Sequence, residues 1–292
     1  DLNTYIFDLN GDYISYSISI GNREPKTIFL GSQRFTIDLS KNAFFPSMYI
    51  SSQINQEFRG RNFDLIKIKE TNTSDASIAK SLFFTRNEIT FLNSKLAKIW
   101  FQFKKDLEGY DPRGNNIYIK KEVGIENVLK FYKNNSIKND IEYHDVYIDS
   151  KIYPSRKREL YGVWNDFKWQ TKLKSNIDLD LGIVFGFDNG AVNENLFIAK
   201  GRGLKGNLIF YLKQNGRVQT EVTFVHVKKD GKFSTLPPEA LKGYTHGKSL
   251  KTNSSIQFLL NKSLSFNLNL NTINDARYRN AITMKGELRA YF

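Results

Sequence analysis

Strict alternation of apolar and polar residues constrains the fold of this 292-residue chain more than any other feature. Between Ile177 and Phe187 every odd-numbered position is large and apolar, while the even-numbered positions are mostly Asp and Gly. Phe167–Lys174, Ile256–Leu260 and Leu264–Leu270 follow the same pattern. Successive side chains of a strand point to opposite faces, so each segment predicts a strand with one apolar and one polar face. The chain is therefore expected to be all-β and antiparallel.

Helical periodicity is nearly confined to one place. A ragged apolar stripe between Glu122 and Lys133 predicts a short helix, which we assign to a long loop or insertion over residues 113–158. Elsewhere, polar pairs such as Asn215-Gly216 separate the strands and favour tight hairpins. We expect residues 1–292 to form a single β domain, with the insertion as part of it.

Two architectures satisfy this alternation: a soluble sandwich and a transmembrane barrel. The apolar face between Ile177 and Phe187 covers 11 positions, which is the length of a tilted strand that crosses a bilayer. Short and long connections also alternate, as they do in barrels with short periplasmic turns. The short ones are Ser175-Asn176, Asn215-Gly216 and Asn261-Lys262, and the long ones are Asp188–Lys200, Lys228–Asn253 and Asn271–Asn280. We therefore predict an up-and-down transmembrane β-barrel of about 14–18 strands.

Composition narrows the chemistry. The chain has no cysteine, which excludes disulfides and thiolate metal sites. Its net charge is +13, but the Lys and Arg residues are spread singly through strands and loops, a distribution that disfavours nucleic-acid binding. Gly201–Gly206 matches a dinucleotide-binding pattern, yet a strand rather than a helix is predicted after it. We expect no cofactor, no metal and no catalytic activity.

The last strand supports the barrel. Counting back by twos from Phe292 passes through Ala290, Leu288, Gly286 and Met284, which are all apolar or small. This alternating strand with a terminal aromatic residue resembles the C-terminal β-signal of bacterial outer-membrane β-barrel proteins. In that family the signal is recognised by the barrel assembly machinery.

A wider resemblance extends over roughly the last 60 residues. The stretch from Pro237 to Ser249 and the final hairpin look similar to the ends of large Bacteroidota outer-membrane proteins. The resemblance implies a location in the bacterial outer membrane and a role as channel, transporter or scaffold subunit of a complex. It also implies contact with outer-membrane lipid, lipopolysaccharide and other outer-membrane or periplasmic subunits. The abrupt start at Asp1 and an odd strand count suggest the C-terminal part of a larger barrel.

Two groups of charged residues are candidates for a functional role. Charges expected to face the lumen are Lys168, Lys172, Lys174, Asp178 and Asp180. The densest basic cluster comprises Lys151, Arg156, Lys157 and Arg158, which could contact lipopolysaccharide phosphates or form a solvated loop.

Two other functions remain open from the sequence. One is a secreted, soluble β-sandwich that binds glycans on its Trp and Tyr side chains. The other is a β-rich hydrolase that uses the carboxylates of Asp178 or Asp180, which are predicted to lie about 7 Å apart on one strand face.

Overall fold

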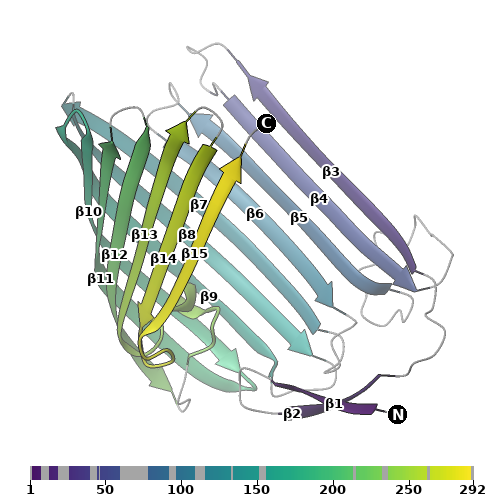
Figure 1. Cartoon of the computed structure of the whole chain (residues 1–292). Coiled ribbons are helices and arrows are strands. Elements are labelled where there is room, and N and C mark those ends of the chain that lie inside the picture. Colours follow the sequence, from purple (N-terminus) through teal and green to yellow (C-terminus); the bar gives the residue numbers. More distant parts are fainter. Residues whose placement is uncertain are drawn as a thin grey trace.

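The computed structural model describes residues 2–7, 13–18, 26–39, 45, 47–59, 78–91, 97–108, 116–132, 134–150, 156–212, 215–231, 236–261 and 264–290. Thirteen strands form one sheet in which every strand is antiparallel to the next along the chain (Figure 1). They are β3 (Lys26–Asp38), β4 (Ser47–Arg59), β5 (Ile78–Phe91), β6 (Ala97–Glu108), β7 (Asn116–Tyr132), β8 (Asn135–Ser150), β9 (Arg158–Lys174), β10 (Ile177–Val192), β11 (Asn195–Leu212), β12 (Gly216–Gly231), β13 (Gly247–Asn261), β14 (Leu264–Asn274) and β15 (Ala281–Ala290). A separate hairpin pairs β1 (Leu2–Phe7) with β2 (Tyr13–Ile18).

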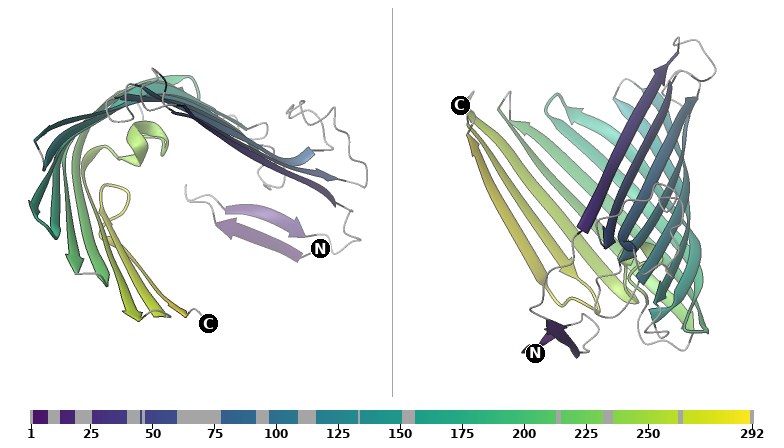
Figure 2. Two further views of the ribbon diagram at one scale, coloured as in Figure 1. Left: turned by 90° about the horizontal axis from the view of Figure 1, so that it is seen from above. Right: turned by 90° about the vertical axis from the view of Figure 1, so that its right-hand side faces the viewer.

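The sheet is a single curved layer, as Figure 2 shows from above. Its edges are β3 and β15, and no other strand in the described ranges pairs with their outer sides. The prediction of an all-β, antiparallel, up-and-down arrangement is confirmed, with the sheet open between these two edges. The alternative of a two-layered sandwich is wrong, because no second sheet packs against either face of this one in the described part of the chain.

The two faces of the sheet differ as the alternation predicts. On β10 the odd-numbered residues Leu181, Ile183 and Phe185 lie on the convex face and are about half exposed, between 46% and 51%. The even-numbered Val184 and Asp188 lie on the concave face and are buried. Apolar exposure continues along the convex face to β15. A broad apolar surface that is left uncovered in this way suits contact with lipid.

Two predictions about local structure are wrong. The expected insertion with a short helix over residues 113–158 is not found, because the described residues of this range contribute the two long strands β7 and β8. Lys121 on the convex face and Val128 on the concave face interrupt the alternation of β7, which is why its apolar residues mimic a helical stripe. The expected long connection Asp188–Lys200 is instead a tight turn at Asn193 and Glu194, which both have positive φ angles of 46° and 68°.

The buried core lies on the concave face of β8 to β12, beneath a short 3-10 helix, η3 (Ala240–Gly243). Figure 2 shows this helix inside the curve of the sheet. The helix belongs to the connection between β12 and β13, which therefore turns inward. Among the described residues, no helix is long and apolar enough to cross a membrane.

Candidate functional site on the concave face

Residues 236–246 form a loop insert that lies against the concave face of the sheet. Its residues Leu236, Ala240 and Leu241 are almost fully buried. They join one apolar cluster with strand residues that include Val184 on β10 and Val225 on β12. The loop insert is therefore attached to the wall by burial of apolar surface, the strongest general stabilising force in a folded chain.

An aromatic pair extends this attachment. The ring of Tyr244 in the loop insert stacks on Trp164 of β9, with centroids 5.6 Å apart and planes 8° from parallel. The ammonium of Lys251 on β13 lies 3.9 Å from the centre of the Tyr244 ring, a cation–π contact. Burial raises the pKa of the Tyr244 phenol.

A buried acid positions the backbone of the loop insert. The carboxylate of Asp188 on β10 is fully buried and accepts a hydrogen bond from the backbone N–H of Leu241. Its other oxygen lies 3.0 Å from Nε2 of His144 on β8, which is also buried. Asp188 thus links two strands of the wall to the loop insert at one point.

Two ion pairs join the rim of the loop insert to the wall. The ammonium of Lys242 lies 2.8 Å from a carboxylate oxygen of Glu142 on β8, and Arg158 on β9 lies 3.1 Å from Glu239. Leu241 and Lys242 have left-handed backbone conformations, with φ of 47° and 54°. Non-glycine residues adopt this region at a cost, which the surrounding contacts must offset.

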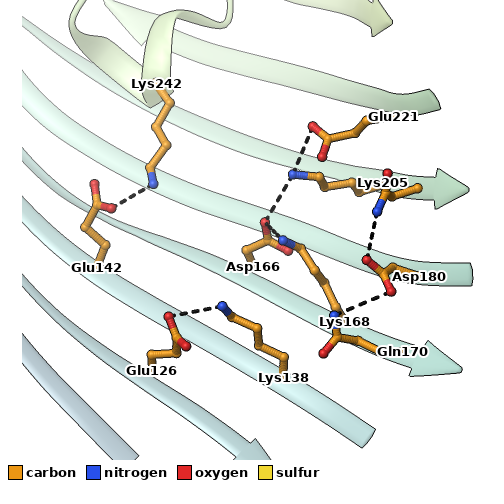
Figure 3. A network of polar contacts seen from close by, with 11 residues as sticks. Glu126, Lys138, Glu142, Asp166, Lys168, Gln170, Asp180, Lys205, Glu221 and Lys242 are labelled. Atoms are coloured by element: carbon orange, nitrogen blue, oxygen red, sulfur yellow. Dashed lines mark hydrogen bonds and ion pairs between the residues drawn. The ribbon is translucent and has the colours of Figure 1, made fainter. Parts of the chain in front are cut away.

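Paired charges cross the concave face of β7 to β12 as an inner-wall ladder (Figure 3). Lys205 on β11 connects two acids, with its ammonium 3.6 Å from Asp166 on β9 and 3.2 Å from Glu221 on β12. Lys168 lies 3.1 Å from the same Asp166. A further pair at 3.0 Å joins Lys138 on β8 to Glu126 on β7. The concave face therefore presents both signs of charge in fixed positions.

Four of the five sequence-predicted lumen charges lie on this same face; the exception is Lys174, which a register shift pairs with Ile177 of the convex face. Asp180 accepts hydrogen bonds from the side-chain amides of Gln170 and Asn207, at 3.4 Å and 3.0 Å. Asp178 accepts a hydrogen bond from the hydroxyl of Tyr211 at 3.2 Å. Both acids, together with Lys172, line a groove of about 360 Å³ near the β9–β10 turn. Lys168 belongs to the inner-wall ladder, and Lys174 lies exposed at the end of β9.

The other predicted residues are dispersed. Arg158 points toward the loop insert, Arg156 and Lys157 precede β9, and Lys151 lies outside the described residues. The final strand places Met284 and Leu288 on the convex face, 71% and 64% exposed, with Gly286 and Ala290 at alternate positions of the same face. Phe292 lies outside the described residues.

Sequence reasoning missed the loop insert and its buried anchors. Asp188 was assigned to a connection, whereas it lies within β10 and is fully buried. A signal existed in the apolar residues Leu236, Ala240 and Leu241 between two polar stretches, because a connection exposed to water has no need of them. In the described ranges, no group of three or more His, Asp or Glu residues is arranged to hold a metal ion.

Comparison with known proteins supports the fold. No protein-family model matches the chain, and no curated protein matches it. Among solved structures, the ferric-catecholate import receptor Fiu from E. coli K12 aligns over 91% of this chain and 56% of its own, with a TM-score of 0.50 and 7% identity. The copper transporter OprC (88% and 46%, TM-score 0.47, 7% identity) and OmpTdeltaL8 of Vibrio cholerae (93% and 100%, TM-score 0.40, 6% identity) are more distant.

The similarity to Fiu shows the fold of an outer-membrane β-barrel wall. The chain spans about half the length of that receptor. Similarity at this level of identity extends to the backbone arrangement and not to the residues that bind or transport a solute.

Proposed function

We propose that this chain forms part of the wall of a β-barrel in the bacterial outer membrane, and that its concave face lines a restricted passage for small polar solutes. The observation that carries the proposal is the division between the two faces. The convex face exposes large apolar side chains, whereas the concave face holds the inner-wall ladder and the loop insert. A barrel wall between lipid and a wet lumen requires this division.

The lengths of the connections support one orientation. The connections from β7 to β8, β9 to β10 and β13 to β14 have two residues each, and the connection from β11 to β12 has three. At the opposite end, β4 and β5 are joined by 18 residues and β12 and β13 by 15, while the β10–β11 turn at that end has two. Outer-membrane barrels place short turns in the periplasm and long loops outside. The loop insert would then enter the lumen from the extracellular side.

The loop insert supports a restricted passage rather than an open pore. It covers the concave face of β8 to β12, and its ion pairs with Glu142 and Arg158 hold its rim against the wall. Transporter and receptor roles, such as the import named for Fiu, fit a lumen that is narrowed in this way. A scaffold role would need no such narrowing.

Catalysis by the buried histidine and acid is the weaker hypothesis. His144 and Asp188 form a pair that a hydrolase could use, but both side chains are buried and the loop insert covers Asp188. A substrate would have to displace Leu241 to reach them. We therefore propose that the pair holds the loop insert in place and has no catalytic role.

Ion selectivity tests the proposed passage. Lys205→Ala removes one positive charge from the concave face and leaves Glu221 without its 3.2 Å partner. In planar bilayers that contain the full-length protein, we expect the reversal potential under a KCl gradient to shift toward cation preference. The matched control is Lys121→Ala, because Lys121 lies on the convex face and also has an acidic partner, Asp145 at 3.4 Å.

Two outcomes contradict the proposal. If Lys121→Ala shifts selectivity as much as Lys205→Ala, the concave face does not line the passage. If carbonate and urea release the wild-type protein from outer membranes, or if its migration in detergent does not change on heating, the chain is not part of a membrane barrel.

A further inference from the structure

An outer rim cluster of basic residues lies on the convex face of β11, β12 and β13. Its members are Lys200, Arg202, His226, Lys228 and Lys248. Across the strands, Lys200 lies opposite Lys228, and His226 lies opposite both Arg202 and Lys248. On each strand they are an even number of residues from an exposed convex-face residue (Leu204, Phe224 or Leu250), and therefore lie on the same face. The side chains of all of them except the half-buried His226 are exposed.

The cations of this cluster lack acidic partners among the described residues. Like charges placed directly opposite each other destabilise a sheet, so an anion bound between them would be favourable. Asp230, two residues beyond Lys228, is the acidic residue on the same face of β12, and its cross-strand neighbour is Ile198 rather than a cation. By contrast, Lys168 and Lys205 on the concave face are ion-paired. A negative charge from outside the sheet would offset this repulsion.

The height of the cluster on the wall indicates where that charge lies. From Leu204 to the end of β11 at Leu212 the convex-face positions are apolar or glycine, a run of nine residues. On β12 the run from Gly216 to Phe224 is also nine residues and carries no charge on this face. A tilted strand crosses the hydrocarbon core in about 9–11 residues. The cluster thus begins where the core ends, on the side of the long connections.

We propose that the outer rim cluster binds the phosphate groups of outer-leaflet lipid, which in this membrane is lipopolysaccharide. Arg202 offers two parallel N–H donors to one phosphate, and the three lysines add charge around it. The acyl chains of the same lipid would lie against Leu204, Phe224 and Leu250 directly below. This inference rests on the proposed function, because it assumes that the convex face contacts lipid.

Lipid binding by a charge-reduced variant tests the proposal. The full-length protein in non-ionic detergent is titrated with diphosphorylated lipid A, with the same lipid after phosphate removal, and with inorganic phosphate. We expect Arg202→Gln/Lys228→Gln to weaken binding of diphosphorylated lipid A at least tenfold. The control Arg279→Gln/Lys285→Gln also removes one Arg and one Lys but lies outside the cluster, and we expect a change of less than twofold. Arg202→Lys keeps the charge and should give an intermediate loss.

Each outcome has a defined meaning. Equal lipid affinity in Arg202→Gln/Lys228→Gln and wild type overturns the proposal, as does equal affinity for the lipid without phosphate. Inorganic phosphate that binds as tightly as lipid A identifies a free-anion site and overturns the lipid assignment. The same samples are tested for heat-modifiable migration and urea resistance. If wild type fails those tests, the barrel itself is wrong; if it passes them while the lipid titration fails, the outer rim cluster alone is misassigned.

Discussion

Release of the loop insert is expected from a single truncation, Leu241→Ala. Leu241 is fully buried between the loop insert and the wall, and its Cδ atoms approach the positions that side chains at Gly186 and Gly201 would occupy. Leucine-to-alanine changes at buried sites cost about 2–5 kcal/mol from lost transfer energy and the cavity left behind. Because Leu241 contacts the wall through a local segment, this loss acts on opening of the loop insert before it acts on the whole sheet.

A loss of about 3 kcal/mol corresponds to a population of the open loop insert roughly 100-fold larger, since each 1.36 kcal/mol is a factor of ten. Hydrogen exchange measured by mass spectrometry on peptides from residues 236–246 reports this population directly. We expect amides of the loop insert to exchange about 100-fold faster. The largest change is expected at the backbone N–H of Leu241, which donates a hydrogen bond to Asp188. Amides in the centre of β10 and β11 should keep their protection.

The matched control is Leu204→Ala, which deletes the same atoms from a residue that is 63% exposed on the convex face. Exchange within residues 236–246 should not change in this variant. If Leu241→Ala leaves the exchange of the loop insert unchanged, or if both variants raise it equally, then Leu241 does not anchor the segment. The view that burial holds the loop insert against the wall would then be refuted.

Two further predictions concern the wall itself. A Cβ atom at Gly162 would lie 1.8 Å from Oδ1 of Asp188, so Gly162→Ala should lower the urea midpoint of unfolding by the equivalent of about 1–3 kcal/mol. At Gly206 the nearest atom to an added Cβ is 3.9 Å away, so Gly206→Ala should leave the midpoint unchanged. Equal midpoints in the two variants would contradict this packing. Met284 is 71% exposed on the convex face, so Met284→Lys should cost roughly 2–4 kcal/mol of folding free energy in liposomes. Thr283→Lys places the charge on the other face and should cost less. The reverse order would contradict the assignment of faces.

The alternation was sufficient to predict most of the strands and their faces. Period-two patterning reports which side chains share a face, so the apolar face of β10 and the polar residues Asp178 and Asp180 were assigned correctly to opposite sides. The prediction failed where polarity does not alternate strictly. On β7, Lys121 on the convex face and Val128 on the concave face removed the signal. In the folded sheet Lys121 is paired with Asp145, and Val128 lines the groove that contains Asp178 and Asp180.

The pairing partners of the charges were decided only by the tertiary structure. Lys205, Asp166 and Glu221 belong to three strands and come together through the register of the sheet, which the sequence of any one strand does not specify. The loop insert is a stronger case. Its residues are close in sequence to β12 and β13, but they are buried by side chains from β8 to β11.

The sequence by itself determined that this chain forms long antiparallel strands with one apolar and one polar face, because strand geometry makes that pattern local. Tertiary structure decided where the polar face is covered and where charge remains unpaired. Asp188 is buried because Leu241 folds over it, and the outer rim cluster forms because Lys200, Arg202 and Lys228 meet across two strands. Both arrangements depend on contacts between residues distant along the chain, and only the folded sheet brings these residues together.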